Sequence, residues 1–130
     1  MSDKPVVQKL LLKPGMRAAL LDAPPAYAQA LESQLPSGVS LARELDDSQF
    51  DFIHAFATQR EELLRNGPAW RRALKPGGLL WVSYPKGGSR AVQTDLNRDV
   101  VRLTVQQVGL DTVSQVAIDE TWSALRLKPA

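Results

Sequence analysis

The sequence lacks the residues from which most metal centres and covalent cross-links are built. Its 130 residues include no cysteine, which excludes disulfide bonds and thiolate zinc sites. There is one histidine, His54, so a site with several histidine ligands is also excluded. We therefore expect no bound metal.

Long apolar runs are missing as well. No run approaches the roughly 20 residues that span a bilayer, and the N-terminus lacks the apolar core of a signal peptide. We expect a cytoplasmic protein that does not contact a membrane.

A strong charge of either sign is also absent. The net charge is +2 and the isoelectric point is about 9.2, which is only mildly basic. A nucleic-acid partner is not expected, because such proteins usually carry a concentrated basic face. The hydrophobic content of 44% is ordinary for a globular protein, and the length predicts one domain over residues 1–130.

The most informative stretch of the sequence is Leu74-Lys75-Pro76-Gly77-Gly78, followed by an apolar run as far as Tyr84. The run does not alternate with polar residues, so it predicts a strand that is buried on both faces. Such strands lie in the middle of a parallel sheet that helices cover. Lys13-Pro14-Gly15 has the same sequence as Lys75-Pro76-Gly77 and is expected to be a second turn that leads into a central strand.

Apolar spacing and turn residues predict ten elements along the chain. Helices are expected over 5–12, 25–35, 60–75 and 95–108, and strands over 16–21, 39–42, 50–56, 79–84, 112–118 and 122–127, the last two as a hairpin. Thr58 with Glu61 has the spacing of a capping box, and Gly67-Pro68 should kink or split the helix that follows. Thr94 or Asp95 should cap the next helix, with an apolar stripe on Leu96, Val100, Leu103 and Val108 and with Gly109 at its end.

The alternation of strands and helices with a terminal hairpin, together with the Leu74–Gly78 motif, resembles the class I methyltransferases. These proteins have a Rossmann-like α/β fold. The resemblance covers roughly residues 13–129. It implies three layers and a mostly parallel sheet in the order 2-1-3-4-6-5, with strands numbered along the chain. The short link over 43–49 would replace a helix–strand–helix unit. Three stretches, 81–86, 94–99 and 116–127, also resemble a family of small bacterial proteins of unknown function.

The sequence departs from the methyltransferase pattern after its first strand. Methyltransferases of this class have a glycine-rich turn there, which lets the backbone approach S-adenosylmethionine. This chain has Asp22-Ala23-Pro24-Pro25-Ala26, and Ala55-Phe56-Ala57-Thr58 stands where an Asn/Asp-Pro-Pro-aromatic motif would be. We therefore expect a non-catalytic binding or interaction module with no cofactor. An active S-adenosylmethionine-dependent methyltransferase is the alternative.

One group of residues could bind a small anion. The loop after the central strand carries Lys86 and Arg90, and it leads to Asp95, Asn97 and Arg98 at the start of a helix. Ligands of open α/β sheets bind at the carboxyl ends of strands, and helix N-termini favour anions. The second alternative is thus a small enzyme or metabolite-binding protein that uses these residues. They could equally form only a basic loop and a helix cap.

Two further expectations concern His54 and the oligomeric state. His54 lies inside an apolar strand, so we expect a hydrogen-bonded core histidine and not a catalytic base. The short link should leave one sheet edge uncovered, which predicts a homodimer with the second strand or the link near its interface.

Overall fold

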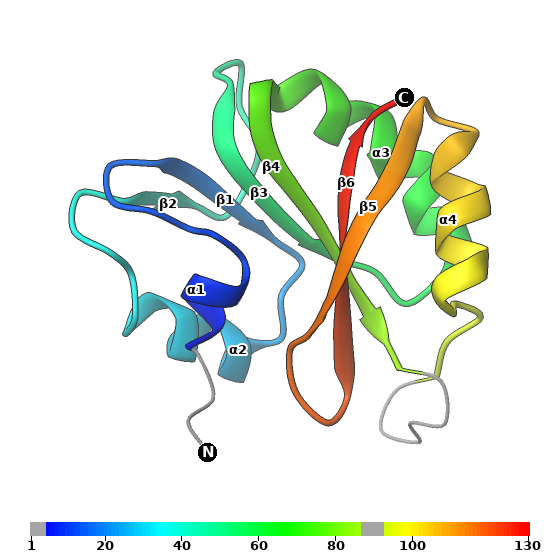
Figure 1. The fold of residues 1–130 in the computed structure, drawn as a ribbon, viewed down its shortest axis with the longest axis horizontal. Helices are drawn as coiled ribbons and strands as arrows, with labels where there is room; N and C mark the ends of the chain where they lie inside the picture. Colours follow the sequence, from blue (N-terminus) through cyan, green and yellow to red (C-terminus); the bar gives the residue numbers. More distant parts are fainter. Residues whose placement is uncertain (1–4, 87–92) are drawn as a thin grey trace.

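The computed structural model describes residues 5–86 and 93–130, which form a six-stranded sheet with helices on both faces (Figure 1). The strands are β1 (Arg17–Leu21), β2 (Ser40–Ala42), β3 (Phe50–Phe56), β4 (Leu74–Pro85), β5 (Leu110–Ala117) and β6 (Trp122–Pro129). The helices are α1 (Val6–Lys9), α2 (Pro25–Glu32), α3 (Arg60–Ala73) and α4 (Arg98–Gln106). No helix among these described residues is long and apolar enough to cross a membrane.

The strand order is β2-β1-β3-β4-β6-β5, as the resemblance predicts. The first four strands of this order are parallel, and β6 pairs antiparallel with both β4 and β5. The prediction of a Rossmann-like α/β fold with a C-terminal antiparallel hairpin is therefore confirmed.

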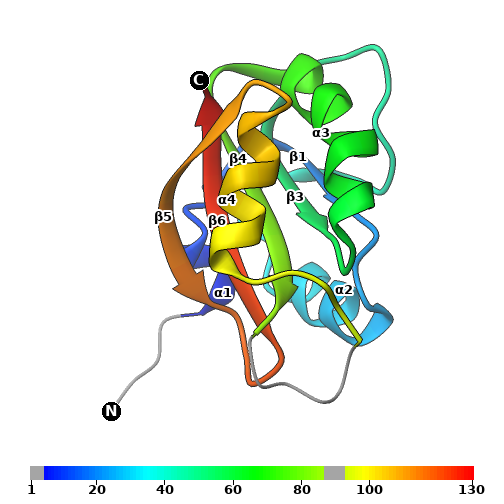
Figure 2. The ribbon, with the colours of Figure 1, turned by 90° about the vertical axis from the view of Figure 1, so that its right-hand side faces the viewer.

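The sheet separates two apolar cores. The first lies between the sheet and the helices α3 and α4, and it contains Leu63, Trp70 and Val105. The second lies under α1 and α2 and includes Leu10, Leu31 and other aliphatic and aromatic side chains. Figure 2 shows the structure turned by 90°, with α3 and α4 beside each other. Because α1 has only four residues and α2 eight, the second core has much the thinner cover.

Strand β4 has a bulge at Lys75–Gly78, where its ladder with β3 shifts register. Leu74 pairs with Phe50 and Leu79 pairs with Phe52, so four residues of β4 lie opposite one residue of β3. Gly77 has a φ of 77°, which a side chain would strain. A Cβ on Gly78 would lie 2.9 Å from the Leu74 side chain, so only glycine fits without a shift.

The beginning of α3 differs from the prediction. Glu62, and not Glu61, reaches back to the helix start, where its Oε1 accepts hydrogen bonds from the amides of Thr58 and Gln59 at 3.0 and 2.9 Å. Gln59 is the N-cap residue. Gly67-Pro68 was predicted to kink or split the helix; it does not split it, because α3 runs over Arg60–Ala73 as one element with Pro68 inside it.

The cap and the buried side of α4 also differ from the prediction. Asn97 is the N-cap, and its Oδ1 accepts a hydrogen bond from the amide of Val100 at 2.9 Å. The residues that α4 buries are Val101, Thr104 and Val105, whereas Leu103 is 56% exposed. Of the predicted stripe, Leu96 is buried and Val100 and Val108 pack against the same core, so the prediction is wrong only at Leu103. Gly109 does end the helix region, with a φ of 82°.

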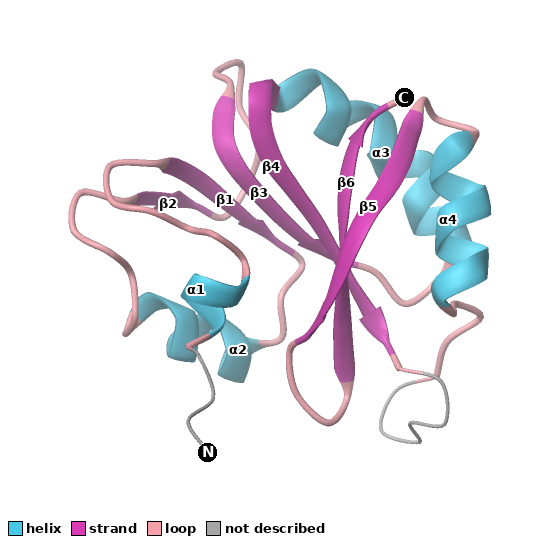
Figure 3. Ribbon diagram, in the orientation of Figure 1, coloured by secondary structure: helices cyan, strands magenta, loops and turns pink. Residues whose placement is uncertain are grey.

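The link between β2 and β3 contains no helix, as predicted (Figure 3). Asp46 organises it, because its Oδ1 accepts from the amide of Ser48 at 2.8 Å and its Oδ2 pairs with Arg17 at 2.7 Å. These contacts let an extended link carry the chain from the edge strand β2 to the central strand β3.

The Asn97 cap generates a stability prediction. Asn97→Ala should lower the free energy of unfolding by about 1 kcal/mol, because the first turn of α4 loses the acceptor for the Val100 amide. Urea denaturation measures the change. Gln107→Ala at the exposed C-terminal end of α4 is the control and should stay within about 0.5 kcal/mol of the parent. Equal losses in the two variants would contradict the cap assignment.

Candidate functional site at the carboxyl edge of the sheet

The carboxyl ends of β1, β3 and β4 meet at one edge of the sheet. The chain turns there from β1 into α2 and from β3 into α3, and Trp122 at the start of β6 pairs with Pro85. The strand connections change direction between β1 and β3, since β2 lies outside β1. Open α/β sheets bind ligands beside such a switch point, so this edge is the place to look for a site.

The turn from β1 into α2 is built without glycine. Asp22 is exposed and has a φ of 57°, a left-handed conformation that Asp tolerates better than most residues. Pro24 is the N-cap of α2 and Pro25 is its first residue. Proline suits these positions because the first amides of a helix have no intrahelical partner. The same prolines remove two backbone donors that could face a ligand.

Three polar side chains form a hydrogen-bonded chain under this edge. His54 on β3 is fully buried, and its Nε2 lies 2.6 Å from the Oγ of Ser83 on β4. Its Nδ1 lies 3.2 Å from the hydroxyl of Tyr27 on α2. Both ring nitrogens are thus satisfied, and the prediction of a hydrogen-bonded core histidine is confirmed.

Burial keeps His54 neutral. It lowers the pKa of the imidazole to about 3 and raises the pKa of the Tyr27 hydroxyl above its usual value. A neutral imidazole has one donor and one acceptor, so the tautomer of His54 decides whether Tyr27 donates to the ring or accepts from it. The chain can therefore hold the Tyr27 hydroxyl in place, but His54 cannot store a proton near neutral pH.

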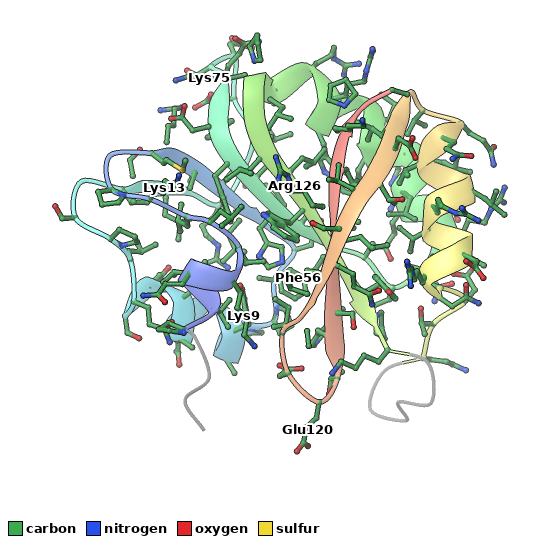
Figure 4. The ribbon with its side chains drawn as sticks, viewed as in Figure 1. Lys9, Lys13, Phe56, Lys75, Glu120 and Arg126 are labelled. Carbon is green, nitrogen blue, oxygen red and sulfur yellow. The ribbon has the colours of Figure 1, made fainter. Side chains whose placement is uncertain are left out.

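A cavity of about 400 Å³ lies between α2 and the β5–β6 turn, and we call it the α2–hairpin pocket. Its walls are mainly apolar and aromatic, and its polar groups are Tyr27, Gln34 and Asp119. The ring of Phe56 holds the two aromatic walls, because its centroid lies 5.0 Å from those of Tyr27 and Trp122. Figure 4 labels Phe56 and also Glu120 in the β5–β6 turn.

Asp119 is fixed at the rim of this pocket. Its Oδ1 accepts hydrogen bonds from the amides of Thr121 and Trp122, each at 2.8 Å. A pocket of this size, with apolar walls and a few fixed polar groups, has the usual character of a small-molecule site. Neither Ser83 nor the aromatic walls could be found from the sequence, since no local pattern relates α2, β3, β4 and β6.

The residues predicted to bind an anion have separate structural roles. The Lys86 amide donates to the Thr121 carbonyl at 2.8 Å, and Arg90 lies outside the described residues. Asp95 does not cap α4 as predicted; its Oδ1 accepts from the amide of Arg60 at 2.7 Å, at the start of α3. Asn97 caps α4. Arg98, the first residue of α4, lines a different cavity of about 220 Å³ with Arg102 and Ser114.

These contacts explain why the helix cap was assigned incorrectly. Asp95 and Asn97 are both residue types that favour caps, and sequence order alone does not show which helix each one reaches. Anion binding across Lys86, Arg90, Asn97 and Arg98 stays a prediction.

The fold is similar to solved methyltransferase structures. A complex of DhpI with S-adenosylhomocysteine (SAH) matches 96% of this chain and 82% of its own chain, at 10% identity and a TM-score of 0.68. An S-adenosylmethionine-dependent methyltransferase from Geobacter sulfurreducens, in complex with SAH, matches 96% of this chain and 89% of its own chain, at 11% identity and a TM-score of 0.64. A putative methyltransferase bound to the Trm112 activator from Haloferax volcanii covers 95% and 86%, at 13% identity and a TM-score of 0.67.

No protein-family model matches the sequence, and no curated protein matches it either. The narrower resemblance to small bacterial proteins of unknown function is therefore not supported. At these identities the similar structures establish the fold, which is the methyltransferase-like Rossmann fold.

These comparisons correct the expectation of a module that does not use S-adenosylmethionine. The similar structures are methyltransferases, and two of the three bind SAH, which favours the methyltransferase alternative. The earlier inference gave too much weight to the missing glycines. The structure shows that the turn after β1 reaches a left-handed conformation through Asp22, so the absence of glycine does not prevent the tight turn.

The buried state of His54 can be tested directly, because it is the only histidine in the chain. In the folded protein its ring signals in NMR spectra should not titrate between about pH 8 and about pH 5, since the ring is neutral above its lowered pKa. In urea the same signals should titrate near the ordinary value of about 6.5. A midpoint near that value in the folded state would contradict the buried hydrogen-bonded chain.

The sign of the linked stability effect follows from the same shift. The unfolded chain binds a proton between about pH 6.5 and the folded pKa of about 3, whereas the folded chain does not. His54 therefore makes its full contribution to the free energy of unfolding above about pH 6.5, and this contribution is lost as the pH falls from about 6.5 to about 3. The slope is at most about 1.4 kcal/mol per pH unit, and His54→Gln should remove it.

Proposed function

We propose that this chain is an S-adenosylmethionine-dependent methyltransferase whose acceptor is a small, largely apolar molecule. The observation that carries the proposal is the position of the α2–hairpin pocket. It begins at Pro24, in the turn that follows β1, and so opens at the same sheet edge where this fold binds its ligands. S-adenosylmethionine supplies a methyl group on a positively charged sulfur.

The residues at this edge fit such a cofactor in part. Glu44 is exposed and follows the end of β2 by two residues, where a Rossmann-type site places an acid that accepts hydrogen bonds from ribose hydroxyls. The turn at Asp22 supplies the close bend. Pro24 and Pro25 offer no amides, so the carboxylate end of the cofactor would have fewer donors than in a glycine-rich turn. The proposal therefore implies binding of moderate strength.

The α2–hairpin pocket defines the class of acceptor. Its aromatic walls suit a ring or a short aliphatic group, and the carboxylate of Asp119 suits an amine or another N–H donor. The Tyr27 hydroxyl, held by His54, adds one fixed polar contact. These groups bind and orient the acceptor; His54 does not receive its proton.

Calorimetry with SAH tests the cofactor proposal. Binding should be saturable and tighter than about 1 mM, a free energy of about 4 kcal/mol. Glu44→Gln should weaken it roughly tenfold, because a charge-assisted hydrogen bond to the ribose becomes a neutral one. Asp47→Asn is the control, since this exposed acid lies in the same link and should leave the affinity unchanged. No heat of binding from the folded protein would overturn the proposal.

We also propose that the protein forms a homodimer through its β2 edge. The support is that β2 is an edge strand of three residues whose link to β3 has no helix over it. Sedimentation equilibrium at tens of micromolar should give the mass of two chains. A monomer at this concentration would contradict the proposal.

A further inference from the structure

The two similar turns in the sequence, Lys13-Pro14-Gly15 and Lys75-Pro76-Gly77, come together in the structure. The first precedes β1 and the second lies near the start of β4, and these two strands are parallel to β3 between them. Both turns are therefore at the amino edge of the sheet, opposite the edge proposed for the cofactor. The glycine of each turn is left-handed, with φ of 79° at Gly15 and 77° at Gly77.

A cavity of about 320 Å³ lies between these turns, and we call it the twin-turn pocket. Its charged lining residues are Lys13, Lys75, Arg126 and Asp51, and its apolar ones include Leu11 and Leu79. Figure 4 labels the three cations, which come from the loop before β1, from β4 and from β6. The lining of this pocket therefore carries three cations and one carboxylate.

The carboxylate of the pocket, Asp51, already has two partners. Asp51 Oδ2 accepts a hydrogen bond from the Arg17 amide at 2.8 Å, and Oδ1 lies 3.3 Å from Lys75 Nζ. These contacts lower the pKa of Asp51 and keep it ionised. Asp51 thereby joins the amino ends of β1, β3 and β4, and it balances only one of the three cations.

Donors remain available after this ion pair forms. An ammonium group has three N–H donors and a guanidinium has five. Within residues 5–86 and 93–130, the side chains of Lys13 and Arg126 make no hydrogen bond or ion pair. Lys13 is exposed and Arg126 is half-buried, so the guanidinium is the more fixed of the two.

The backbone at the pocket also permits close approach. A Cβ at Gly77 would meet no atom within 4 Å, so its backbone faces open space. Gly78 could carry no side chain without displacing Leu74 or its neighbours. At these two glycines no side chain covers the backbone beside the cations, so a compact oxyanion can approach it closely.

We propose that the twin-turn pocket binds the phosphate group of a small phosphorylated molecule. Lys13, Lys75 and Arg126 supply the positive charge, and Arg126 can hold two oxygens at once. The volume suits a small molecule, and Leu11 and Leu79 provide an apolar wall for its remaining atoms. A nucleic-acid strand is disfavoured, because the cations surround one compact cavity and do not form an extended stripe.

Titration with inorganic pyrophosphate tests the proposal on the full chain. Calorimetry should detect one saturable site, and the amide signals of Gly77 and Gly78, which line the pocket, should shift in NMR spectra with the same midpoint. Lys13→Gln and Arg126→Gln should each weaken binding roughly tenfold, because each removes a charge-assisted contact. Thermal unfolding of each variant verifies that it is folded.

Lys9→Gln is the matched control. Lys9 is a cation on α1 that does not line the pocket, and its Nζ donates to the Ala117 carbonyl at 3.3 Å. It should leave pyrophosphate affinity unchanged. Equal weakening in all three variants would show a general charge effect and would overturn the proposal. So would binding of single-stranded RNA without binding of pyrophosphate. SAH affinity should be the same in every variant, so this proposal and the cofactor proposal can fail separately.

Discussion

Burial of the central strands on both faces is the constraint on which the rest of this structure depends. β3 and β4 lie between two apolar cores, so the side chains on both faces of these strands cannot include unpaired polar groups. His54 and Ser83 are the buried polar side chains of these two strands, and each is satisfied by the other and, for His54, by Tyr27. Chemistry in this fold is therefore restricted to the ends of strands and to the helices beside them.

The two edges of the sheet use this restriction differently. At the carboxyl edge, aromatic walls and a fixed carboxylate surround an apolar pocket beside the turn after β1. At the amino edge, Asp51 joins three strand starts and leaves cations around a smaller cavity. The four residues of α1 and the eight of α2 cover their face only partly, and this thin cover leaves room for the α2–hairpin pocket between α2 and the hairpin.

Local conformation and local sequence are less tightly linked here than the glycine-rich pattern of methyltransferases suggests. Asp22 is left-handed without being glycine, while Gly78 is required by the closeness of Leu74 and not by its own φ. Similarly, Pro68 remains inside α3, whose Leu63, Trp70 and Ala73 pack into the core. Tertiary packing outweighs the local preference of a single residue in such cases.

The sequence by itself determined the order of the elements, the buried character of β3 and β4 and the hairpin at the end of the chain, because apolar spacing and turn residues are local signals. Which residue caps which helix was decided only by the tertiary structure: Asp95 reaches α3 across 35 positions, and Glu62 replaces Glu61. The partners of His54 and the meeting of the two Lys-Pro-Gly turns were likewise decided by strand register and order. These contacts join residues distant in the sequence, and no local pattern encodes such distances.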